Sequence, residues 1–408
     1  MMPTASFSGL VIVAAVAFLV PLLLGLAPRL RLPATVLEIL VGIAIGPSGL
    51  TLVQVDVPIQ VLALIGLAFT LFLAGLEIEF DRLRGPLLTL SAAGFVVSFG
   101  LALLVSYGLT LVGLVQTPLF VAIVLSATSL GILIPLLKDT GQTSTNFGQL
   151  VIAAATIADF GTILLLSLLF SREATSPATQ LTLIAGLVVV GVAIGVTVVR
   201  VERSMRLAGV LLRLQDTSAQ IRIRGAFLLL LIFAAFAQWV GLETILGAFI
   251  AGAVLKLVDR DQAMTHPEFR RRLEAIGFGV FIPVFFITSG LRFDLRVLFA
   301  SPQALALVPL FLAALLIVRG VPAVLYQSYL GARLSRAAGL LQATTLTFVV
   351  VSAQLGVELH TINAATGAAL VAAALLSVLI FPLAALTILR RGTARPVPQR
   401  RTSLAMEP

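Results

Sequence analysis

Thirteen apolar segments, separated by short charged or turn-forming loops, make up most of the chain. A helix needs about 20 residues to cross the hydrocarbon core of a bilayer, and most of the segments have about that length. A soluble domain could not bury them all, because 59% of the 408 residues are hydrophobic and only 11% are charged. We therefore predict an all-α polytopic membrane protein with thirteen transmembrane helices. The expected spans are about 7–27, 32–50, 58–78, 87–113, 117–137, 148–170, 180–199, 223–240, 242–257, 275–292, 303–328, 337–356 and 363–389.

The same pattern sets the expected domain organisation. Residues 1–390 form one transmembrane domain, and residues 391–408 form a basic cytoplasmic tail. The first span lacks a basic region before it, so we expect it to be kept rather than cleaved as a signal peptide. With no Cys in the chain, disulfides and thiolate metal sites are excluded. No phosphate loop or catalytic triad is present, so we predict neither an enzyme nor a bound cofactor.

Basic residues are distributed unequally between the two sides of the membrane. The loops that follow odd-numbered segments hold 23 of the 27 Lys and Arg residues. Cytoplasmic loops of membrane proteins carry such an excess. We therefore expect the N-terminus outside and the C-terminus in the cytoplasm, and we attribute the net charge of +9 to topology rather than to nucleic-acid binding.

Three short motifs occur twice, in the same order and at similar separations. The pairs are Leu40–Gly46 with Leu246–Gly252, Ala74–Phe80 with Ser289–Leu295, and Ser126–Leu130 with Gln342–Leu346. Because the second copy starts seven segments later, an odd number, it would be inverted in the membrane. We predict two inverted six-helix repeats, at about 7–170 and 223–389, joined by a linker helix at 180–199. Such repeats are typical of secondary transporters.

Asp159 is the only charged residue in the apolar run from Val151 to Leu169. An ionised Asp at the bilayer centre costs about 2.5–3.5 kcal/mol, and intramembrane acids often mark ion pathways. We interpret Asp159 as the binding site for a proton or a monovalent cation; the alternative is a structural acid paired with a basic residue. Thr156 lies three residues earlier on the same helix face. Carboxylate, hydroxyl and carbonyl oxygens are hard ligands that suit Na⁺ or K⁺.

Two polar clusters interrupt apolar spans at equivalent positions of the repeats. The first contains Ser126, Thr128 and Ser129, and the second contains Gln342, Thr344 and Thr345. Ser and Thr side chains can hydrogen-bond backbone groups in place of the helix ladder. We expect both spans to be broken at the clusters and to cross there. The alternative is that the hydroxyls only aid helix packing.

Arg319 and Glu38 are further charges within apolar segments. Arg319 cannot lose its charge, so it either braces the broken spans or pairs with an acid, for which Asp159, Glu38 and Glu77 are candidates. Glu38 either lines an access funnel or supports packing. We place Glu77, together with the acids that follow it, at the membrane interface.

Several stretches carry a resemblance to a known family. They are LPATVLEILVGIAIGPSGL (32–50), LFLAGLEIEFDRLR (71–84), the block from Ser126 to Asp159, LGAFIAGAVL (246–255) and PVFFITSGLRFDL (283–295). Together they resemble the membrane domain of the monovalent cation:proton antiporter superfamily, in the branch of Kef-type potassium/proton and bacterial sodium/proton exchangers. The resemblance covers about residues 7–390.

This resemblance implies a homodimeric antiporter of the bacterial inner membrane that serves pH homeostasis. It implies a dimer domain and a core domain that moves like an elevator, with crossed, broken helices containing Thr128 and Thr344. The essential acid of the family matches Asp159, and its basic residue on the eleventh span matches Arg319. The chain departs from the family at Ala158, where relatives commonly have Asn, Asp or Gln, and a nucleotide-binding domain like that of Kef-type proteins is not expected.

The resulting hypothesis is exchange of one cation for one proton by competition at Asp159. Since Ala158 cannot titrate, we expect the exchange to be electroneutral. Two alternatives remain from the sequence: a sodium-coupled symporter for an organic anion, and a channel or non-transporting sensor.

Overall fold

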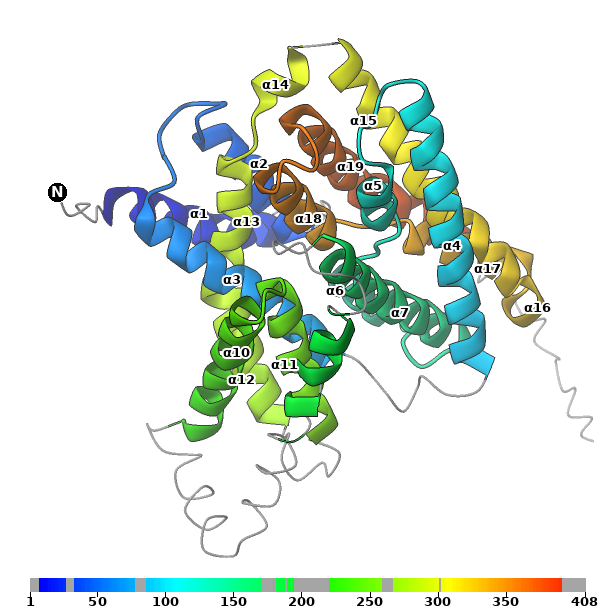
Figure 1. Cartoon of the computed structure of the whole chain (residues 1–408), viewed down its shortest axis with the longest axis horizontal. Coiled ribbons are helices and arrows are strands. Elements are labelled where there is room, and N and C mark those ends of the chain that lie inside the picture. Colours follow the sequence, from blue (N-terminus) through cyan, green and yellow to red (C-terminus); the bar gives the residue numbers. More distant parts are fainter. Residues whose placement is uncertain are drawn as a thin grey trace, which may run out of the picture.

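A computed structural model describes residues 7–26, 33–77, 86–170, 179–193 without 180, 188 and 192, 220–258, 267–300 and 302–390 (Figure 1). Every regular element in these ranges is helical. The first half contains α1 (Phe7–Leu26), α2 (Ala34–Ile45), α3 (Val57–Leu76), α4 (Pro86–Leu111), α5 (Pro118–Leu125), α6 (Leu130–Asp139) and α7 (Asn146–Leu169). The second contains α10 (Ile221–Trp239), α11 (Thr244–Val258), α12 (Pro267–Ile276), α13 (Ile282–Leu291), α14 (Leu295–Phe299), α15 (Pro302–Leu315), α16 (Gln327–Leu330), α17 (Ala332–Gln342), α18 (Thr347–Glu358) and α19 (Ala364–Arg390).

Two of the long helices contain π-helical segments. Gly277–Phe281 (η1) joins α12 to α13, and Leu316–Gly320 (η2) follows α15. A 3₁₀ segment, Val321–Tyr326 (η3), continues from η2 to α16. Such segments within α-helices are frequent at functional sites, and η2 contains Arg319.

The predicted all-α membrane protein is confirmed. Ten helices of the described part are long and apolar enough to cross a membrane. Three shorter apolar helices, Ala34–Ile45, Leu181–Gly191 and Thr244–Leu257, lie within three further predicted spans. The second span, predicted at 32–50, ends earlier than expected, since α2 stops at Ile45. Gly46 and Pro47 follow, and Pro has no backbone N–H to continue the helix. The tail 391–408, most of the basic loops and part of the linker 180–199 lie outside the described residues.

The helices form two groups, defined by their most extensive contacts. The α3 group comprises α1 to α3 and α10 to α13, with close pairs between α3 and α11 and between α2 and α13. The α7 group comprises α4 to α7 and α15 to α19, in which α19 packs on α15, α17 and α18. Figure 1 shows the α3 group on the left and the α7 group on the right. The boundary between the groups is where a cavity, described below, is found.

Glycines of the repeated motifs bring helices of the α3 group into close contact. A Cβ on Gly252 in α11 would meet the carbonyl oxygen of Phe72 in α3, and one on Gly75 would meet that of Phe249. The same relation joins Gly42 in α2 to Gly290 in α13. Small residues permit such approach between membrane helices, where packing rather than the hydrophobic effect drives association.

We predict that Gly252→Ala destabilises the protein by about 1–3 kcal/mol, because backbone must shift to admit the methyl group. At an unconstrained helix position the same change is favourable by roughly 0.5–1 kcal/mol. The measurement is the thermal unfolding midpoint in detergent. Gly108→Ala is the control, since a Cβ there meets no atom within 4 Å. Equal midpoints for the two variants would show that the contact between α3 and α11 is not tight.

Candidate functional site

Two helices are broken at the two polar clusters, and the breaks contact each other. α5 ends at Leu125 and α6 begins at Leu130, while α17 ends at Gln342 and α18 begins at Thr347. The Ser129 N–H donates to the Thr344 carbonyl at 3.1 Å. In return, the Leu346 N–H donates to Ser129 Oγ at 2.8 Å. Residues more than 200 positions apart in the sequence thus satisfy the backbone groups that the breaks leave free.

Hydroxyl groups complete the hydrogen bonding of the breaks. Thr128 Oγ1 donates to the carbonyl of Gln342 at 2.8 Å. Ser377 Oγ on α19 accepts from the Thr345 N–H at 3.1 Å and lies 2.9 Å from the Thr345 carbonyl oxygen. The sequence analysis missed Ser377, although a lone buried Ser in the apolar run of α19 was a usable signal. Of the other cluster hydroxyls, Ser126 donates to Ala122 and Thr344 to Leu340, whereas Thr345 Oγ1 is buried with no hydrogen-bond partner among the described residues.

Arg319 braces the crossing from η2. Its side chain is 1% exposed. Nε donates to Thr128 Oγ1 at 2.9 Å and Nη1 donates to Ser98 Oγ at 3.1 Å. Through Thr128 the guanidinium reaches the carbonyl of Gln342, at the end of α17. Of the two roles predicted for Arg319, bracing the broken spans or pairing with an acid, the structure supports bracing. Within the described part of the chain, Arg319 bonds the hydroxyls of Thr128 and Ser98 and makes no direct bond to a carbonyl of the breaks.

Asp159 belongs to α7, and its side chain lies next to the first residue of α6. Its Oδ2 accepts from the N–H of Leu130, the first residue of α6, at 3.3 Å. Its Oδ1 is buried and has no hydrogen-bond partner among the described residues. The N-terminus of a helix carries a partial positive charge that favours an anion. One carboxylate oxygen is therefore held by the protein, while the other is open to a proton or a cation.

Two predicted site residues are not brought to this point. Thr156 is buried, donates to Ile152 of its own helix at 2.9 Å and does not line the cavity. Glu38 on α2 is 4% exposed, and its Oε2 has no partner in the described part of the chain. It follows Thr35, a cavity-lining residue, by three positions, but does not line the cavity itself. The choice between funnel and packing roles for Glu38 stays open.

A cavity of about 730 Å³ separates the two helix groups beside Asp159. Thr70, Ala74, Glu77, Phe278 and Phe286 line it from the α3 group. Thr128, Ser129, Leu130, Asp159 and Thr347 line it from the α7 group. It reaches Pro33 before α2, Glu77 after α3 and Thr140 after α6, which all lie at the same end of the bundle in the predicted topology. Its described lining contains two carboxylates and no Lys, Arg or His.

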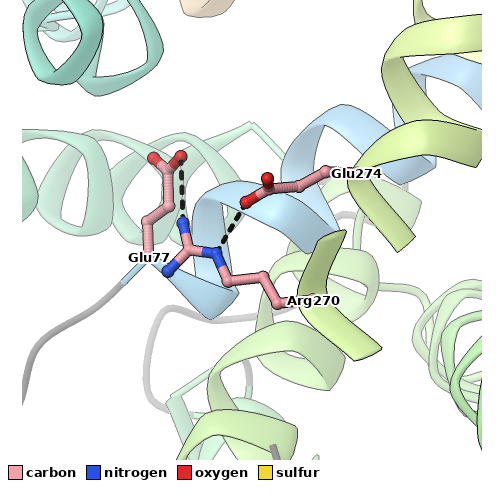
Figure 2. Close-up of polar contacts among 3 residues, drawn as sticks. All are labelled: Glu77, Arg270 and Glu274. Atoms are coloured by element: carbon pink, nitrogen blue, oxygen red, sulfur yellow. Dashed lines mark hydrogen bonds and ion pairs between the residues drawn. The ribbon is translucent and has the colours of Figure 1, made fainter. Parts of the chain in front are cut away.

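Glu77, predicted at the membrane interface, directly follows the last residue of α3 and lines the cavity on the wall opposite Asp159. Its side chain is 17% exposed. Figure 2 shows Arg270 of α12 between Glu77 and Glu274. Arg270 Nη2 lies 3.8 Å from Glu77 Oε1, and Arg270 Nε lies 2.6 Å from Glu274 Oε1. Burial raises the pKa of Glu77 to about 7, against the lowering effect of Arg270. Nothing in the sequence pattern showed that this acid lies on a cavity wall.

Comparisons with known proteins agree with this geometry. Residues 14–391 match the family described as "Sodium/hydrogen exchanger, transmembrane". A putative Na⁺/H⁺ antiporter, YjbQ of Bacillus subtilis, is 32% identical over 93% of the chain, which spans 62% of that relative. A glutathione-regulated potassium-efflux system protein of Haemophilus influenzae is 31% identical over 66% of the chain and 43% of its own length.

A solved structure shows the same fold. The sodium proton antiporter MjNhaP1 from Methanocaldococcus jannaschii superposes with a TM-score of 0.68, over 94% of this chain and 98% of that one. The two sequences are 18% identical, so the likeness concerns the fold alone.

We predict that Thr128→Val destabilises the protein by about 1–3 kcal/mol, because Arg319 Nε and the Gln342 carbonyl each lose a buried partner. The measurement is the thermal unfolding midpoint in detergent. Thr162→Val is the matched control, since its buried hydroxyl bonds only carbonyls of α7, and we expect a much smaller shift. Shifts of equal size would mean that Thr128 does not connect Arg319 to the crossing.

Proposed function

Because the chain belongs to the sodium/hydrogen exchanger family, we propose that it is a secondary active antiporter that exchanges Na⁺ or K⁺ for H⁺. The observation that carries this proposal is the state of Asp159. One of its oxygens is bound by the start of α6, and the other is unpartnered beside a cavity with no basic residue in its described lining.

The mechanism is competition for Asp159 Oδ1. A proton or a cation neutralises the carboxylate, and the two cannot bind together. The neutral form crosses the apolar barrier between the helix groups, whereas the bare carboxylate meets the cost of about 2.5–3.5 kcal/mol for an ion in the membrane. Empty carriers therefore stay on one side, and each crossing in one direction carries a cation while the return carries a proton.

The crossing leaves few protein ligands free for the cation. Ser129 Oγ already accepts from the N–H groups of Leu346 and Thr347, which uses both of its lone pairs. Thr128 Oγ1 donates to the Gln342 carbonyl and accepts from Arg319, which leaves it one lone pair. The cation would bind Asp159 Oδ1, carbonyl oxygens of the breaks and water, for which the cavity has room. Because retained water weakens discrimination by size, the site is suited to Na⁺ and K⁺ alike.

The division into two helix groups suggests how Asp159 could cross the membrane. We propose that the α7 group carries Asp159 past a fixed α3 group, in the elevator manner, and that two copies associate as a homodimer. The thirteen spans would form two inverted repeats. In support, glycines of the second and tenth spans pack together, and so do glycines of the third and ninth spans. The ninth span is the predicted equivalent of the second, and the tenth is that of the third. With the N-terminus outside and the C-terminus in the cytoplasm, the cavity opens to the cytoplasm.

A sodium-coupled symporter of organic anions is the second candidate, and the cavity argues against it. An organic anion would need a positive partner, and the described lining offers only Asp159 and Glu77 as charged groups. Saturable cation-dependent proton flux would also exclude a channel or a non-transporting sensor.

We predict that Asp159→Asn abolishes exchange in proteoliposomes. A preformed pH gradient should collapse when Na⁺, K⁺ or Li⁺ is added to the wild type and should persist with the variant. Asp56→Asn is the matched control: Asp56 caps α3 by accepting from the Ile59 N–H at 3.1 Å, and Asn can keep this cap. If the Asp159 variant keeps its activity, Asp159 is a structural acid and the proposal fails.

We predict that exchange is electroneutral, because Ala158 offers no second titrating group beside Asp159. The pH difference that just balances a fixed cation gradient should not change when a membrane potential of about 100 mV is imposed. One net charge per cycle would shift the balance by about 2.3 kcal/mol. A measurable shift would show that more than one proton moves per cation.

A further inference from the structure

Glu77 shares the cavity with Asp159 but belongs to the other helix group. It is the only carboxylate that the α3 group contributes to the described lining, and it lies at the end of α3 where the cavity reaches the end of the bundle. A cation that enters from this end meets Glu77 on one wall before it reaches Asp159 on the other.

Arg270 leaves Glu77 incompletely neutralised. The contact of Arg270 Nε with Glu274 is a short hydrogen bond of 2.6 Å, within one helix. Its contact with Glu77, through Nη2, is a longer ion pair of 3.8 Å (Figure 2). Arg270 and Glu274 are 44% and 39% exposed, whereas Glu77 is 17% exposed. The Arg270 guanidinium thus binds Glu274, the more exposed acid, at a shorter distance than Glu77, the more buried one.

From this arrangement we propose that Glu77 is a cation-recruiting site: it binds the incoming Na⁺ or K⁺ at the cavity mouth and passes it to Asp159. Arg270 keeps its bond to Glu274 throughout, and the incoming cation replaces only its longer contact with Glu77. The inference rests on the proposed function, because it names a second station on the path to Asp159.

The charges of the cavity favour this role. A cleft lined by one sign of charge concentrates counter-ions and raises their rate of arrival by 10-fold or more. The charged groups that face Glu77 in the described structure are Arg270, Glu274 and Asp159, and of these only Arg270 is positive. Because burial raises the pKa of Glu77 to about 7, the carboxylate is charged at alkaline pH and neutral at acid pH.

The experiment is cation-dependent proton flux in proteoliposomes, with the cation added on the side to which the cavity opens. For Glu77→Gln we expect the half-saturating cation concentration at pH 8 to rise about tenfold, while the maximal rate stays within about twofold. At pH 6 the difference from the wild type should shrink, because wild-type Glu77 is then largely protonated. Glu77→Asp, which restores the charge, should recover most of the affinity.

Glu358→Gln is the matched control. It removes an acid that lies 3.8 Å from Arg292, the same separation as in the pair of Glu77 with Arg270, and that does not line the cavity, so its half-saturating concentration should equal that of the wild type. Equal increases for both Gln variants would overturn the proposal, because the effect would then come from the loss of any acid. A loss of maximal rate at unchanged half-saturation would overturn it as well.

Failure of this inference is distinguishable from failure of the proposed function. If the wild type exchanges cations and Asp159→Asn does not, but Glu77→Gln matches the wild type at both pH values, only the recruiting role is lost. If the wild type shows no more cation-dependent proton flux than Asp159→Asn, antiport itself is refuted, and the proposed role of Glu77 is refuted as well.

Discussion

The structure depends on satisfying the backbone groups that two broken helices expose inside the membrane. Lipid offers no hydrogen bonds, so each freed N–H and C=O must find a protein partner or the cavity. Across the crossing, the Ser129 N–H donates to Thr344 and Ser129 Oγ accepts from the Leu346 N–H, while Ser377 bonds Thr345 and Thr128 donates to Gln342. Two half-helix starts and two half-helix ends are thereby fixed at one place.

The same crossing separates the two charges that belong to it. Arg319 binds hydroxyls beside the end of α17, where helix carbonyls concentrate negative charge, and Asp159 binds the start of α6, where N–H groups concentrate positive charge. Each charge is hydrogen-bonded at a helix end, and the two attract each other without a direct bond. A direct ion pair would have occupied the free oxygen of Asp159, and the position open to a transported ion would have been lost.

Packing outside the crossing differs in kind between the helix groups. In the α3 group, glycines bring the backbones of α2 and α13 and of α3 and α11 together without polar bridges. In the α7 group, buried hydroxyls and one guanidinium hold unwound segments in place. The cavity follows the boundary between these groups, as the proposed movement of one group past the other requires.

The sequence by itself determined the helical membrane class, the polar clusters of the two broken spans and the buried acid, because each depends on the composition of one segment and its cost in lipid. It could not choose a partner for Arg319, exclude Thr156 from the cavity, find Ser377 or place Glu77 on the cavity wall. These depend on which faces of distant helices meet, and a single apolar helix is compatible with many neighbours. Only the tertiary structure, which brings Thr128 to Gln342 and α3 opposite α7, decided them.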